Sequence, residues 1–292
     1  MRSDPREYEL VVPGSLRAVL ALVDREPGTW LPIAGGTDVM VPYAAGKLAA
    51  RKLVSIWNLP ELRAMEVLPG EVRIGAGCTF TDLRRHEIIA REFPLLATAA
   101  AWTGGIANQN RATLGGNIVN ASPAADSLPA LLVYGATLVL VSSNGERELP
   151  YGHFHQGYKQ HALEPFELIR TIRLPRRYLD HLSFARKIGA RKAQAISKVC
   201  IAALGKVTNG VVEDLRIALG SVAPVPLRLT ETERELIGKR IAPGLASLAA
   251  QTVAQQIRPI DDIRSEANYR AAVAANLVAE FVESLCVRAA GR

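Results

Sequence analysis

Two segments with adjacent glycines, far apart in the sequence, constrain the fold of this chain more than any other feature. The first is Ala34-Gly35-Gly36-Thr37-Asp38, directly after the apolar stretch Leu31-Pro32-Ile33, and the second is Ala112-Thr113-Leu114-Gly115-Gly116-Asn117. Adjacent glycines allow positive φ angles and a close approach of the backbone to a ligand. Successive N–H groups in such a turn form a concave anion site. We therefore expect two loops that hold a pyrophosphate.

Short polar side chains accompany both glycine pairs. Thr37, Thr113 and Asn117 supply hydrogen-bond donors, while Asp38 and Asp126 can accept from ribose hydroxyls or cap a following helix. Neither segment is the G-x-G-x-x-G fingerprint, and no G-x-x-x-x-G-K-[ST] occurs, which disfavours Rossmann and P-loop folds. A single glycine pair is usually a tight turn, whereas two loops closing on one nucleotide would form a flavin site.

Composition predicts a globular protein with two domains. The chain has 292 residues, of which 49% are hydrophobic and 22% are charged. The longest apolar stretch, 127–141, is interrupted by Pro129 and Gly135, and it falls short of the roughly 18 residues that a membrane span needs. The start, 1–6, lacks the apolar core of a secretory signal. These features predict no membrane span and a cytoplasmic location.

The net charge of +7 raises the question of nucleic-acid binding. The basic residues are spread along the chain apart from a cluster in 170–192, aromatic residues are 5%, and no nucleic-acid-binding motif accompanies the cluster. We predict no nucleic-acid binding, and a basic surface suited to anionic cofactors or acidic partner subunits.

Metal and side-chain catalytic sites are not predicted. The cysteines Cys78, Cys200 and Cys286 are scattered and lack C-x-x-C spacing, so a disulfide framework, a zinc site or an iron–sulfur cluster is disfavoured. The histidines at 153, 155 and 161 lack a fourth ligand at suitable spacing and are interpreted as solvated loop residues. No Ser-His-Asp or Cys-His arrangement suggests a catalytic residue.

Periodicity predicts a mixed α and β chain. In 15–25 the apolar spacing is that of an amphipathic helix, with Ser15 as its N-cap. Strands at 31–34 and 52–56, with a helix interrupted near Pro42 between them, predict a β-α-β-α-β lobe over 1–57. Further expected strands are 72–74, 137–141, 146–149, 168–172, 181–187, 198–207 and 211–219, and further expected helices are 93–102, 127–134, 227–236, 245–256 and 269–287.

The chain resembles the medium, FAD-binding subunit of the molybdenum hydroxylases, which include xanthine and carbon monoxide dehydrogenases. Besides the glycine segments, the resemblance rests on 56–62 (Ile-Trp-Asn-Leu-Pro-Glu-Leu), 74–77 (Ile-Gly-Ala-Gly), 117–126 (Asn-x-x-x-x-Ser-Pro-x-x-Asp) and 221–228 (Ser-Val-Ala-Pro-Val-Pro-Leu-Arg). It implies an α+β fold. A two-lobed, PCMH-like FAD-binding domain would span 1–175, with lobes 1–57 and 58–175. A smaller domain at 176–292 would hold a three-stranded antiparallel sheet and helices.

The resemblance also implies which residues contact FAD. The backbone of 33–38 and 113–117 would hold the pyrophosphate from two sides, and Asp126 would meet the adenosine half. Ile169 would pack by the isoalloxazine ring, and Lys187 would reach toward the flavin. The implied cofactor-binding residues are Leu31, Pro32, Ile33, Ala34, Gly35, Gly36, Thr37, Asp38, Thr113, Leu114, Gly115, Gly116, Asn117, Asp126, Ile169 and Lys187.

The implied function is electron transfer within a larger complex. Molybdopterin would reside on a large partner subunit and [2Fe–2S] clusters on a small one, in a dimer of heterotrimers, and electrons would pass through FAD to NAD+ or another acceptor. The stretch 154–159 is similar to one in xanthine dehydrogenases and favours a purine substrate. Other possibilities are a carbon monoxide dehydrogenase-type or other aldehyde or N-heterocycle dehydrogenase subunit, a stand-alone flavin oxidoreductase, and a flavin-free scaffold, which the intact glycines disfavour.

Overall fold

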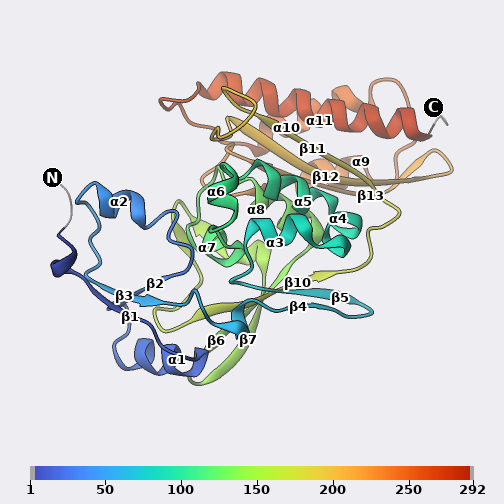
Figure 1. The fold of residues 1–292 in the computed structure, drawn as a ribbon. Helices are drawn as coiled ribbons and strands as arrows, with labels where there is room; N and C mark the ends of the chain where they lie inside the picture. The colour runs from blue at the N-terminus through green and yellow to red at the C-terminus, as the bar shows by residue number, and fades with distance from the viewer. Residues whose placement is uncertain (1–3, 290–292) are drawn as a thin grey trace.

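The N-terminal lobe is a three-stranded parallel sheet with two helices. In the computed structural model, which describes residues 4–289, the strand order is β1-β3-β2 (Figure 1). This β-α-β-α-β arrangement confirms the prediction for the lobe. Its elements are β1 (Glu9–Val11), α1 (Leu16–Arg25), β2 (Trp30–Ile33), α2 (Met40–Ala44) and β3 (Lys52–Ser55), with the 3-10 turns η1 (Pro5–Glu7) and η2 (Pro60–Leu62) on either side.

Local sequence explains both helices of this lobe. The Ser15 hydroxyl accepts a hydrogen bond from the Ala18 N–H, and one apolar stripe of α1 is buried. The expected interruption at Pro42 is wrong, because Pro42 lies in the first turn of α2. The N–H groups of a first turn have no partner within the helix, so a proline there costs little.

The second lobe combines an antiparallel sheet with a layer of short helices. The sheet has the order β4-β5-β10-β6-β7, and β8 and β9 form a separate hairpin. Helices α3, α4, α6 and α7 were not predicted, because each is too short to show a helical period. The elements are β4 (Met65–Val67), β5 (Glu71–Gly75), α3 (Phe80–Arg85), α4 (Glu87–Glu92), α5 (Pro94–Trp102), α6 (Ile106–Gln109), α7 (Leu114–Val119), α8 (Ser127–Tyr134), β6 (Thr137–Ser142), β7 (Gly145–Pro150), η3 (Tyr151–His153), β8 (His155–Gly157), β9 (Gln160–His161) and β10 (Leu168–Pro175).

The C-terminal part is an antiparallel sheet with helices on its outer face. It contains β11 (Leu182–Ile188), β12 (Val199–Thr208), β13 (Val211–Gly220), β14 (Leu227–Arg228), α9 (Thr230–Leu236), α10 (Leu245–Gln256) and α11 (Ala267–Ala289). The sheet has a short fourth strand beyond the expected three, so the predicted helix at 227–236 is wrong over its start. Leu227 pairs with Leu219 of β13, and the Leu229 N–H donates to Ile217 O, so the backbone is satisfied in an extended form.

The layers alternate through the molecule. The helices of the second lobe lie between its own sheet and the C-terminal sheet, and α10 and α11 cover the far side of that sheet (Figure 1). Ala202, Leu204 and Ala218 of the C-terminal sheet belong to the same hydrophobic cluster as α5, α7 and α8. The second lobe and the C-terminal sheet therefore share one core. Within residues 4–289, no helix has the length and apolarity to cross a membrane.

Candidate functional site

The fold brings the two glycine segments into direct contact. A Cβ added at Gly35 would overlap the carbonyl oxygen of Arg111, and it would lie 3.2 Å from the Ala112 nitrogen. The Arg111 Nε donates a hydrogen bond to Gly35 O at 3.3 Å. The first lobe thus meets the second where each carries its glycine segment. Only a residue without a side chain fits at position 35.

The second glycine segment is also attached to the strand end that precedes it. The Leu114 N–H donates to Cys78 O at 2.9 Å, and the Gly115 N–H donates to Ala76 O at 2.8 Å. A Cβ at Gly115 would lie 2.8 Å from that Ala76 oxygen. Glycine at 115 is therefore required by close backbone packing.

The expectation of two loops with positive φ is wrong in part. Gly36 has φ +77°, but Gly115 and Gly116 lie inside α7, a helix of six residues. The Thr113 hydroxyl caps this helix by accepting from the Gly116 N–H at 3.1 Å. Glycine pairs indicate tight backbone geometry, and here one pair serves a turn while the other serves the close packing of a helix.

The first segment is open to a ligand along its length. Residues 31–37 are half-buried, and Asp38 is exposed just before α2. Leu31, Pro32 and Ile33 belong to β2, where they pair with β3. The first glycine segment therefore begins, at Ala34, directly after the end of this strand. Asp38 makes no helix cap in the structure, because α2 begins after Val39 without a side-chain cap bond.

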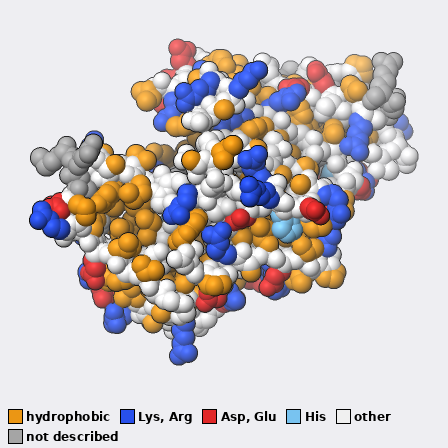
Figure 2. Space-filling model, in the orientation of Figure 1, with side chains coloured by type: hydrophobic (Ala, Val, Ile, Leu, Met, Phe, Trp, Pro, Cys, Tyr) orange, Lys and Arg blue, Asp and Glu red, His pale blue; other side chains and the backbone are white. Residues whose placement is uncertain are grey.

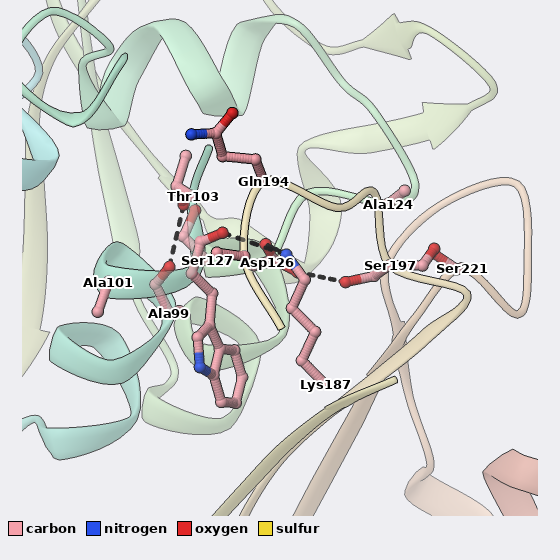
Figure 3. A network of polar contacts seen from close by, with 12 residues as sticks. Ala99, Ala101, Thr103, Ala124, Asp126, Ser127, Lys187, Gln194, Ser197 and Ser221 are labelled. Carbon is pink, nitrogen blue, oxygen red and sulfur yellow. Dashed lines mark hydrogen bonds and ion pairs between the residues drawn. The ribbon is translucent and has the colours of Figure 1, made fainter. Parts of the chain in front are cut away.

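Asp126 and Lys187 form a buried ion pair between the second lobe and the C-terminal sheet (Figure 3). The Lys187 Nζ lies 2.5 Å from Asp126 Oδ2 and donates to Trp102 O at 3.1 Å, and the Ser197 hydroxyl donates to Asp126 Oδ1 at 2.5 Å. Burial raises the pKa of Asp126, and the Lys187 charge opposes that rise. Asp126 precedes α8 but makes no cap bond to it, so the alternative role as a helix cap is wrong.

A cavity of about 350 Å³ lies beside this carboxylate. Its lining includes Asn117 and Asp126, which the sequence analysis identified, and also residues from segments that the sequence analysis did not identify. Asn117 is held in place because its Oδ1 accepts from the Ser127 hydroxyl at 2.6 Å. The unpredicted lining includes Thr103, Gly104, Gly105, Asn108 and Gln194. The adjacent glycines at 104 and 105 were a signal in the sequence that could have located this wall.

Ile169 is placed near the glycine segments but is enclosed. It lies on β10 and is 5% exposed, in the same hydrophobic cluster as Ala76, Leu114 and Ile118. The pairing of β10 with β6 shifts register between Ile169 and Thr171. Its side chain thus packs close to the residues that support α7.

The histidines at 155 and 161 are not solvated loop residues as expected. The His155 Nε2 lies 2.9 Å from Ile118 O in α7, its Nδ1 lies 3.3 Å from the Tyr151 hydroxyl, and His161 stacks on Phe154. Burial lowers the pKa of both histidines. His155 therefore links α7, the helix that contains Gly115 and Gly116, to Tyr151. Residues 4–289 contain no group of side chains arranged to hold a metal ion.

A second, larger cavity of about 530 Å³ is lined by Trp57, Asn58, Pro60, Arg63 and Ala64. On the face shown in Figure 2, Lys and Arg side chains lie in several separate groups, and a hollow separates the N-terminal lobe from the C-terminal part.

Comparison with known proteins identifies the family. The profile described as "FAD binding domain in molybdopterin dehydrogenase" matches residues 6–177, and the one described as "CO dehydrogenase flavoprotein C-terminal domain" matches residues 184–285. The chain is 31% identical over 262 residues to the xanthine dehydrogenase FAD-binding subunit of Escherichia coli O157:H7, covering 89% of this chain and 90% of that one. It is 28% identical over 286 residues to the carbon monoxide dehydrogenase medium chain of Hydrogenophaga pseudoflava, covering 98% and 99%.

The solved structure of carbon monoxide dehydrogenase from Hydrogenophaga pseudoflava, in a form lacking the Mo-pyranopterin moiety of its cofactor, superposes with a TM-score of 0.91 at 28% identity over 96% of both chains. The chain therefore belongs to the family of FAD-binding medium subunits of the molybdenum hydroxylases. This confirms the predicted family, the α+β fold with a separate C-terminal sheet, and an oxidoreductase subunit with FAD as its cofactor. In this family the molybdenum cofactor and the iron–sulfur clusters belong to partner subunits.

Proposed function

We propose that the FAD diphosphate lies between the two glycine segments, against the backbone of 33–38 and 113–117. The observation that carries this proposal is the contact of Gly35 with Arg111, which places the turn of the first glycine segment directly against the backbone that leads into the second. A glycine turn of this kind suits an anion. Gly115 packs closely on Ala76, and this contact fixes the position of the second glycine segment beside the proposed diphosphate site.

The adenosine half then belongs in the 350 Å³ cavity. Asp126 offers a carboxylate acceptor for ribose hydroxyls, and Asn117 and Asn108 offer amide groups on the same wall. Lys187, ion-paired with Asp126, is the residue that we assign to the flavin side of this cavity. Ile169 contributes apolar contact near the isoalloxazine ring.

Bound FAD supplies the redox chemistry, because it accepts two electrons and can release them singly or as a pair. The residues of this chain bind and orient it. We propose that the chain passes electrons from [2Fe–2S] clusters of a small partner through FAD to NAD+ or another acceptor. A large molybdopterin subunit would complete the complex, assembled as a dimer of heterotrimers.

A purine is the substrate that we propose for the whole complex. Support comes from the similarity to the Escherichia coli xanthine dehydrogenase subunit and from the Gly-Tyr-Lys stretch at 157–159. A carbon monoxide dehydrogenase-type complex is the second candidate, favoured by the solved structure with a TM-score of 0.91. We also propose the division into domains at residue 175, supported by the end of one family match at 177 and the start of the next at 184.

Absorption spectroscopy of the purified full-length chain tests the cofactor site. The expected result is a flavin spectrum with bands in the near-ultraviolet and the blue, either as purified or after added FAD, and release of FAD rather than FMN on denaturation. A protein that stays colourless after incubation with FAD would refute the proposed site in this chain. Reconstitution with the two partner subunits, with xanthine or carbon monoxide as donor and NAD+ as acceptor, then separates the substrate candidates.

A further inference from the structure

Arg111 lies between the two lobes and contacts the first lobe in two independent ways. Its guanidinium carbon is 3.9 Å from the centroid of the Trp57 ring, and its Nε donates to Gly35 O. Its own carbonyl oxygen occupies the space that a Cβ at Gly35 would fill. The side chain and the main-chain carbonyl of Arg111 therefore both contact the first glycine segment, and together they fix its position relative to the second.

The two guanidinium groups on the Trp57 ring differ in their ion pairing within residues 4–289. Arg63, the other guanidinium on the Trp57 ring at 4.9 Å, is ion-paired with Asp82 at 3.1 Å. Arg111 makes no ion pair with a carboxylate in the part of the chain that the structure describes, and its side chain is exposed. A stacked guanidinium has a fixed orientation with N–H groups left to donate, and planar guanidinium groups match phosphate oxygens.

We propose that Arg111 is a positioning residue for the diphosphate of FAD. Stacked on Trp57 and bonded to Gly35 O, it holds the first glycine segment against the second, and it places a positive charge beside the cradle between them. This inference rests on the proposed FAD site and adds the residue that closes it. The Trp57 ring, on which the Arg111 guanidinium stacks, also lines the 530 Å³ cavity.

Titration of the flavin-free full-length chain with FAD, and separately with riboflavin, tests this role. Arg111→Gln removes the charge, Arg111→Lys keeps the charge but removes the planar stack, and Arg63→Gln is the matched control on the same Trp57 ring. Loss of a hydrogen bond to a charged group corresponds to about ten- to a hundredfold weaker FAD binding for Arg111→Gln. Riboflavin, which lacks the diphosphate, should bind equally to Arg111→Gln and wild type.

Two further results are expected for a role in binding the diphosphate. Wild-type affinity for FAD should fall more steeply with added salt than that of Arg111→Gln, because one screened charge is missing in the variant. Arg111→Lys should recover this salt dependence and part of the affinity, and Arg63→Gln should behave as wild type toward FAD.

Two outcomes would overturn the inference while the FAD site itself stands. One is equal FAD affinity of wild type and Arg111→Gln. The other is an equal loss of FAD and riboflavin binding without recovery by Arg111→Lys, which would leave Arg111 as a contact between lobes only. Failure of the wild-type chain to bind FAD would instead refute the proposed function, and the inference with it.

Discussion

Gly115 should tolerate no side chain, although it lies in a helix where alanine is ordinarily favoured. In Gly115→Ala the new Cβ would lie 2.6 Å from the Ala76 Cβ and 2.8 Å from Ala76 O, whereas ordinary contact starts at 3.4 Å. The backbone at Ala76 would have to retreat by roughly 0.6–0.8 Å, and overpacking of this kind costs about 1–3 kcal/mol. The higher helix propensity of alanine returns about 0.5–1 kcal/mol.

The net expectation for Gly115→Ala is a free energy of unfolding lower by about 1–2 kcal/mol. Gly116→Ala is the matched control, one position along the same helix. Its Cβ would meet only the Thr113 hydroxyl, at 2.9 Å, which can rotate away. Losing that cap costs about 1 kcal/mol, and the gain in helix propensity nearly offsets it.

Urea unfolding of the flavin-free chains, followed by far-ultraviolet circular dichroism, measures both variants. A Gly115→Ala variant as stable as wild type would refute the argument that close packing on Ala76 requires glycine. So would a Gly116→Ala variant that loses as much stability as Gly115→Ala.

Three further predictions concern buried titratable groups. The Arg176 guanidinium lowers the pKa of Glu92 to about 2. The stability that this pair contributes is therefore present above the ordinary carboxyl pKa and is lost as the pH falls toward 2. Glu92→Gln should lower the free energy of unfolding by about 3 kcal/mol, measured by urea unfolding at pH 7. Burial lowers the pKa of His155, so below its ordinary value of 6.5 the unfolded chain binds a proton that the folded chain excludes. Stability should therefore fall between pH 7.5 and 5.5 in urea unfolding, and less steeply in His155→Gln. Burial raises the pKa of Cys78 to about 12 and also raises that of Cys200, so neither thiol should react with an aromatic disulfide reagent at pH 8 until the chain is unfolded in guanidinium.

Much of the fold follows from periodicity that the sequence displays locally. The stripe of α1 and its Ser15 cap, the α8 range 127–134 and the α10 range 245–256 are found where the pattern predicts them. The strands expected at 137–141 and 146–149 lie within β6 and β7, which pair as an antiparallel hairpin. These features depend on residues within a few positions of one another, so sequence alone can reveal them.

Long-range contacts were less accessible to sequence reasoning. The resemblance placed Asp126 and Lys187 near one cofactor, but their direct ion pair across 61 positions depends on how the C-terminal sheet meets the second lobe. Arg111 was not singled out, because its role arises from its contact with Gly35, 76 positions away. The α7 helix was missed because two glycines in six residues suppress the usual helical signal.

The shared ion pair has a consequence for any attempt to divide the chain. A fragment ending at residue 177 would keep both glycine segments but lose Lys187 and Ser197, the two groups that satisfy the Asp126 carboxylate. That carboxylate would be left without its partners, and the face of α8 that packs on β12 and β13 would be exposed to water. Autonomous folding of the fragment is therefore disfavoured. During synthesis, the 350 Å³ cavity is complete only after residues beyond 177 have emerged, because Gln194, Ala195 and Ile196 form part of its lining.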